Sequence, residues 1–126
     1  MTDKKLLIID DEEAFRELAR AAAERIGFDV VTTGSAEEFR NAFHDYNPTT
    51  ILLDVVMPET DGVELIQWLA AEGCTAKIVV VTGFAPNYSR MAQALGEARG
   101  LTSVSTLRKP VSISDLRREI CSDYAA

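Results

Sequence analysis

The chain has 126 residues, of which 47% are apolar, and a formal net charge of −7. This length predicts a single domain, residues 1–126, that is large enough to bury a hydrophobic core. The acidic balance argues against direct binding of nucleic acid, and no apolar run approaches the ~20 residues that span a bilayer.

The chain has two cysteines, Cys74 and Cys121, which do not form a CxxC pair and are too few for a disulfide framework. We predict two reduced thiols, with Cys121 at a core position of the last helix. The charged N-terminus, residues 1–5, is followed by only four apolar residues, which is not the pattern of a signal peptide. These features predict a cytoplasmic protein.

Apolar runs alternate with segments of helical periodicity along the chain, a pattern that favours βαβ units and a parallel sheet. The boundaries come from that periodicity, from the glycine at position 27 and from capping signatures at Ser35 and Ser112. Strands are predicted at about residues 5–10, 28–33, 50–54, 77–82 and 103–108, and helices at about 12–26, 35–45, 63–71, 87–98 and 112–122.

Five parallel strands with five helices predict a doubly wound α/β domain with the strand order 2-1-3-4-5. The first and third strands would then be central neighbours, on either side of the point where the strand order reverses. Right-handed crossovers would place the first and last helices on one face of the sheet and the other three helices on the opposite face.

Four of the predicted strands end in residues that can bind ions or phosphoryl groups. Asp10 and Asp11 follow the first strand, Asp54 ends the third, Thr82 ends the fourth, and Lys109 follows the fifth. Because the carboxyl ends of parallel strands lie at one edge of the sheet, we expect these side chains to meet there.

Three carboxylates at one edge repel one another, and a bound Mg²⁺, which prefers oxygen ligands, would relieve the repulsion. We predict that Asp11 and Asp54 bind the ion directly, Asp10 through water, and the backbone carbonyl of Val56 as a further ligand. Asp54 could then act as a nucleophile towards phosphorus, with the Lys109 ammonium neutralising charge on the phosphoryl group.

Two further predictions concern the strand ends. The Thr82 hydroxyl could donate a hydrogen bond to a phosphate oxygen. The bond between Lys109 and Pro110 is predicted to be cis, since an X-Pro bond adopts this isomer at small cost and a sharp turn there would aim Lys109 inward. The acids Glu12 and Glu13, beside Asp11, are interpreted as a solvated first helical turn without a functional role.

The chain resembles the receiver domain of two-component response regulators over nearly its whole length. The motifs that carry this resemblance, in order, are Asp10-Asp11, Leu53-Asp54 with Met57-Pro58 and Asp61-Gly62, Val81-Thr82-Gly83, and Lys109-Pro110. The resemblance implies phosphorylation of Asp54 by a phosphohistidine on a histidine kinase or phosphotransfer protein, with Mg²⁺ at the three acids. It also implies that Thr82 and Lys109 sense the phosphoryl group and that a downstream protein partner reads the change.

The chain departs from the family pattern at Thr106, where receivers usually carry an aromatic residue that turns inward on activation. Three interpretations stay open. Phe84 or Tyr88 takes part of the switching role, the output is a loop rearrangement alone, or Thr106 is neutral and partner binding is mostly insensitive to phosphorylation.

We interpret the chain as a stand-alone receiver. The alternatives are a receiver fragment of a larger transcriptional regulator and a constitutive, pseudo-receiver binding module. A phosphohydrolase is disfavoured because Val56 stands where such enzymes often carry a second aspartate, so we expect no enzyme activity beyond the domain's own phosphorylation and dephosphorylation. Receivers commonly pair through the fourth helix, fifth strand and fifth helix, which leaves a weak homodimer open.

Overall fold

The computed structural model describes residues 4–54, 62–82 and 103–121. In these ranges the strands are β1 (Lys5–Ile9), β2 (Asp29–Thr33), β3 (Thr50–Asp54), β4 (Lys77–Thr82) and β5 (Ser103–Arg108). The helices are α1 (Glu13–Glu24), α2 (Ala36–Tyr46), α3 (Gly62–Ala71) and α5 (Ile113–Cys121). The helix predicted at about 87–98 lies outside the described residues.

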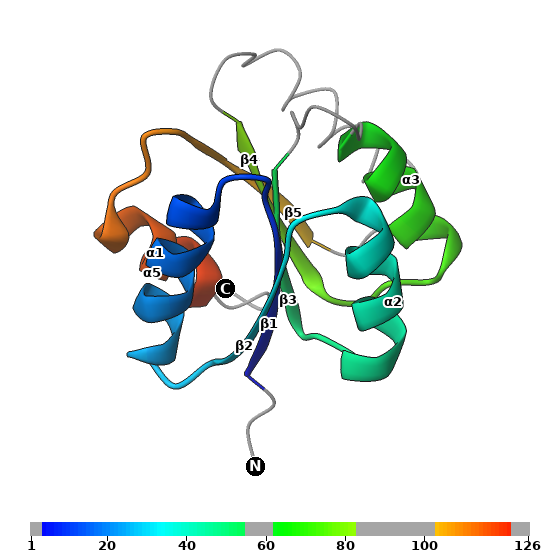
Figure 1. Cartoon of the computed structure of the whole chain (residues 1–126), viewed down its shortest axis with the longest axis horizontal. Coiled ribbons are helices and arrows are strands. Elements are labelled where there is room, and N and C mark those ends of the chain that lie inside the picture. Colours follow the sequence, from blue (N-terminus) through cyan, green and yellow to red (C-terminus); the bar gives the residue numbers. More distant parts are fainter. Residues whose placement is uncertain (1–3, 55–61, 83–102, 122–126) are drawn as a thin grey trace.

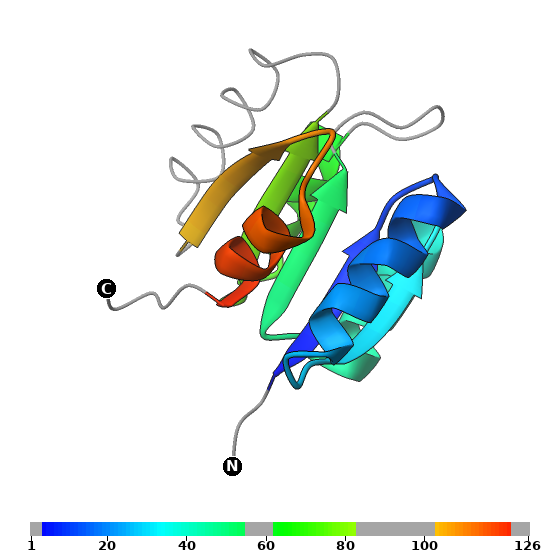
Figure 2. The same cartoon turned by 90° about the vertical axis from the view of Figure 1, so that its left-hand side faces the viewer.

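The five strands form one parallel sheet in the order β2-β1-β3-β4-β5, which confirms the predicted topology. Figure 1 shows α1 and α5 on one face of the sheet and α2 and α3 on the other. The turned view in Figure 2 looks onto the face that α1 and α5 cover. The predicted distribution of helices is therefore confirmed for the four that the structure describes.

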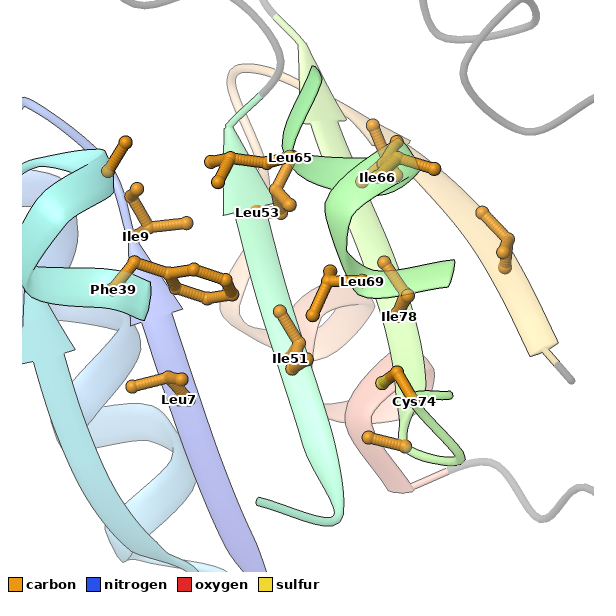
Figure 3. Close-up of a cluster of buried hydrophobic side chains, with 14 residues drawn as sticks. Leu7, Ile9, Phe39, Ile51, Leu53, Leu65, Ile66, Leu69, Cys74 and Ile78 are labelled. Atoms are coloured by element: carbon orange, nitrogen blue, oxygen red, sulfur yellow. The ribbon is translucent and has the colours of Figure 1, made fainter. Parts of the chain in front are cut away.

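The central strands are buried on both faces, which explains their unbroken apolar runs. All four residues from Leu6 to Ile9 have no exposed surface. Leu7 and Ile9 belong to the core beneath α2 and α3, shown in Figure 3, whereas Leu6 and Ile8 belong to a second core beneath α1 and α5. Alternate side chains of each strand therefore serve different layers.

Aromatic side chains join α2 to α3 in the first core. Phe39 is fully buried, and its ring centroid lies 6.5 Å from that of Phe43 and 6.4 Å from that of Trp68. Nε2 of His44 in α2 also lies 3.1 Å from Oε1 of Glu72, which follows the end of α3. These contacts fix the two helices as one layer over the sheet.

The helix ends follow the predicted signals, with small shifts. Gly27 has the positive φ, 93°, of a glycine that follows a helix, but regular α1 ends earlier, at Glu24. The Ser35 hydroxyl accepts a hydrogen bond from the backbone N–H of Glu38. The Glu38 carboxylate accepts from the backbone N–H of Gly34, one residue before the expected position.

Both cysteines are free, as predicted, but Cys121 was wrongly placed in the core. Leu116 and Ile120 are the buried residues of α5, and Cys121 is exposed. One residue turns a helix by about 100°, so the position after Ile120 leaves the buried face. Cys74, by contrast, is buried beside the core under α3.

Among the described residues, no helix is both long and apolar enough to cross a membrane.

Candidate functional site

Three candidate side chains converge because each continues a row of residues on the α1 and α5 side of the sheet. Successive strand residues point to opposite faces, so every second residue shares a face. The rows consist of the buried Leu6 and Ile8 before Asp10, the buried Leu52 before Asp54, and the half-buried Leu107 before Lys109. The strand periodicity thus carries the two acids and the lysine to one end of the same layer.

The acidic cluster consists of Asp10, Asp11 and Asp54. One carboxylate oxygen from each can be chosen so that all lie within 4.8 Å of one another. Asp10 and Asp54 are only 1% and 4% exposed, whereas Asp11 faces solvent. Two buried acids and one accessible acid are a suitable oxygen donor set for a hard divalent cation.

Hydrogen bonds hold Asp10 on both carboxylate oxygens. Its Oδ1 accepts from the backbone N–H of Glu12 at 2.8 Å, and its Oδ2 accepts from Lys109 Nζ at 3.0 Å. Its backbone carbonyl accepts from Arg16 Nη1 at 2.7 Å, and its backbone N–H donates to the carbonyl of Thr33. With both carboxylate oxygens engaged, Asp10 is suited to act on a cation through water.

The Lys109 ammonium lies among three carboxylates. Besides Asp10, Nζ is 2.9 Å from Glu12 Oε1 and 3.6 Å from Asp54 Oδ2, and it lies 4.5 Å from the centroid of the Phe15 ring. Burial by itself lowers the pKa of Lys109. The hydrogen bonds to Glu12 and Asp10 and the charges of Asp54 and Asp10 outweigh burial and raise the pKa above its usual range. The ammonium therefore stays charged at neutral pH.

The predicted cis bond between Lys109 and Pro110 is confirmed. Glu12 is exposed, as predicted for a solvated helical turn, and its carboxylate also contacts the Lys109 ammonium. The hydrogen bond and charge of Lys109 in turn lower the pKa of Glu12. The two residues are separated by 97 positions, so local patterning carries no signal for this pair.

The other candidate residues are placed only in part. Thr82 is the last residue of β4 and pairs in register with Arg108, but its side chain lies outside the described residues. Val56, Phe84 and Tyr88 also lie outside them. Thr106 is half-buried on β5 opposite Val80, one residue from the row that leads to Lys109.

This arrangement can bind a divalent cation and, beside it, an anionic phosphoryl group next to a fixed ammonium. Such a site at the carboxyl edge of a 2-1-3-4-5 sheet, where the strand order reverses, defines a flavodoxin-like α/β protein with a ligand site at its usual place. The model of the response regulator receiver domain family matches residues 6–121, and the chain belongs to this family.

Individual relatives agree with this assignment. The alkaline phosphatase synthesis transcriptional regulatory protein PhoP of Bacillus subtilis is 35% identical over 80 residues, covering 64% of this chain and 33% of PhoP. The phosphate regulon transcriptional regulatory protein PhoB of Pseudomonas aeruginosa is 32% identical, covering 64% of this chain and 35% of PhoB. The chain thus covers about a third of the length of these two relatives.

Solved structures show the same fold. Full-length FixJ from B. japonicum has a TM-score of 0.82 and 27% identity, covering 95% of this chain and 57% of FixJ. A response regulator from Burkholderia pseudomallei, solved with a phosphorylated aspartic acid, calcium ion and citrate, has a TM-score of 0.78 and 24% identity. That likeness covers 98% of this chain and 69% of the other.

Proposed function

We propose that Asp54 is the phosphoacceptor of this receiver domain and takes its phosphoryl group from a phosphohistidine. A carboxylate oxygen of Asp54 forms the new bond to phosphorus, the P–N bond of the donor breaks, and the released imidazole nitrogen takes up a proton. The observation that carries the proposal is the buried Asp54 carboxylate, 3.6 Å from a lysine ammonium and beside two further acids.

The residues of the acidic cluster fit a resident Mg²⁺. Carboxylate oxygens are the ligands that this ion takes in proteins, and the three acids lie close enough to share one ion. In our proposal Asp11 and Asp54 bind the ion directly, Asp10 acts through water, and the backbone carbonyl of Val56 adds a ligand. When bound, the ion supplies positive charge against the transferring phosphoryl group.

Lys109 and Thr82 complete the proposed site. Lys109 neutralises phosphoryl charge and orders the site, because its ammonium is already held within reach of Asp54. In this proposal the hydroxyl of Thr82, at the end of the neighbouring strand, donates a hydrogen bond to a phosphoryl oxygen. Phe84, Tyr88 and Thr106 are the candidates for transmitting the change to a partner.

We propose that the donor is a histidine kinase or a histidine phosphotransfer protein and that the phosphorylated domain signals by a changed affinity for a downstream protein. We expect catalysis only of its own phosphorylation and dephosphorylation, and action in the cytoplasm. The relatives are named as transcriptional regulators, and membership of the receiver family supports the kinase as partner.

The test is phosphate-affinity electrophoresis after incubation with acetyl phosphate, with and without Mg²⁺. We expect a shifted band for the wild-type chain only with Mg²⁺, and none for Asp54→Asn. Asp29→Asn, at an exposed acid on β2 away from the carboxyl edge, is the matched control and should shift like the wild type. A shift that survives in Asp54→Asn would refute Asp54 as the acceptor.

A further inference from the structure

The Lys109 ammonium is surrounded by groups from one short segment of the chain. Asp10 and Glu12 accept its hydrogen bonds at 3.0 and 2.9 Å, and the ring of Phe15 lies 4.5 Å from it. We call these three residues the lysine socket. All three lie between the end of β1 and the first turn of α1, whereas Asp54 comes from β3.

The Glu12 side chain contacts Lys109 and does not cap the helix that it precedes. Glu12 is the N-cap residue of α1, with extended φ and ψ of −91° and 112°, yet its side chain makes no capping hydrogen bond. Its own backbone N–H is held by Asp10 Oδ1 at 2.8 Å, which fixes where the side chain begins. Its carboxylate contacts Lys109 instead of the helix.

The ammonium is closer to the socket than to the proposed phosphoacceptor. Its 3.6 Å separation from Asp54 Oδ2 exceeds the ~2.7–2.9 Å of a charge-assisted hydrogen bond. A phosphoryl group on Asp54 would therefore compete with the socket for this ammonium. The Asp10 side chain is 1% exposed and would be left buried without this partner, whereas the Glu12 side chain is 63% exposed and can exchange its partner for water.

We propose that Glu12 is a positioning residue that holds the Lys109 ammonium on the α1 side of the site and thereby opposes its engagement by a phosphoryl group on Asp54. This inference rests on the proposed function. Glu12 sets how tightly the site holds the phosphoryl group, and it acts through Lys109 without contacting that group itself.

The experiment measures binding of beryllofluoride, a phosphoryl analogue, by calorimetry at saturating Mg²⁺. The variants are Glu12→Ala and Glu13→Ala, which each remove one negative charge from adjacent exposed positions. A general field effect acts on both, but only Glu12 contacts Lys109. We expect Glu12→Ala to bind the analogue about two- to five-fold more tightly than Glu13→Ala, the range of an exposed ion pair.

The salt dependence of the affinities separates an electrostatic role of Glu12 from a purely structural one, because a structural effect would not depend on salt. In 1 M NaCl, where the screening length is about 3 Å, the difference between the two variants should shrink towards zero. Equal affinities of the two variants at low salt, or weaker binding by Glu12→Ala, would overturn this inference while leaving the proposed function intact. Failure of the wild-type chain to bind the analogue with Mg²⁺ would overturn both.

Discussion

Replacement of Asp54 by asparagine should stabilise the fold when no metal is bound. The Asp54 carboxylate is nearly buried, within 4.8 Å of two other carboxylates and 3.6 Å from the Lys109 ammonium. At an effective dielectric constant of about 20, the two repulsions cost about 7 kcal/mol and the attraction returns about 5 kcal/mol. Asparagine has nearly the same shape and no charge, so it removes a net cost of about 2 kcal/mol, less where solvent screens the pairs.

The assay is urea unfolding followed by fluorescence, in EDTA and in Mg²⁺. In EDTA, Asp54→Asn should be more stable than the wild type by about 1–2 kcal/mol. Mg²⁺ at ten times its dissociation constant should add about 1.4 kcal/mol to the wild type and less to the variant, because a ligand has been lost. Glu17→Gln, at an exposed acid of α1, is the control and should change stability by less than about 0.5 kcal/mol.

Equal or lower stability of Asp54→Asn in EDTA would refute the view that the acidic cluster is under electrostatic strain in the folded state. If Asp54→Asn is more stable in EDTA but Mg²⁺ stabilises it as much as the wild type, the electrostatic strain is supported and Asp54 is not a metal ligand.

Three further outcomes are expected. Phe39→Ala should lower the free energy of unfolding by about 3–5 kcal/mol, since a fully buried ring is lost, and urea unfolding beside the milder Phe39→Leu measures this. Cys121 should react with iodoacetamide well before Cys74 in a mass-spectrometric time course, because Cys74 is buried and burial raises the pKa of its thiol; equal rates would contradict this. Lys109→Met should lower the free energy of unfolding. The difference from the wild type should be constant between about pH 6 and 9 and should become smaller above about pH 10.4. The pKa of Lys109 is raised by folding, so its stabilising contribution is fully present below the unfolded pKa and is lost only as the pH rises through the folded one; a loss that already changes near pH 8 would be inconsistent.

The fold could be predicted because its signals are local. Runs such as Leu6 to Ile9 are apolar without alternation, as expected of a strand buried on both faces. Gly27 and Ser35 mark helix ends through their own backbone and side-chain chemistry. The helix ends differ from the prediction by a residue or two, as in α1, which ends at Glu24 rather than at about residue 26. Cys121 was misplaced because a position one residue beyond the last buried residue of a helix can fall outside the buried face.

The part of the site that could be predicted is the part formed by residues at the carboxyl ends of strands. Asp10 follows one buried strand and Asp54 ends its neighbour, so their meeting follows from the strand order. The contact of Glu12 with Lys109 could not be predicted in this way, because the two residues lie 97 positions apart in the sequence. The sequence shows only an acid near the start of a predicted helix, and the structure then shows that its side chain makes no capping hydrogen bond.

The separation of the two cores also bears on how this domain can vary. The side chains beneath α2 and α3 form one cluster and those beneath α1 and α5 form another, with the sheet between them. Asp10, Asp54 and Lys109 extend rows of the second cluster. Substitutions in the first cluster therefore alter overall stability and reach the acids only through the strands. Those in the second cluster can change the positions of the reactive groups directly, so equal losses of packing in the two halves of the interior should not have equal effects on the site.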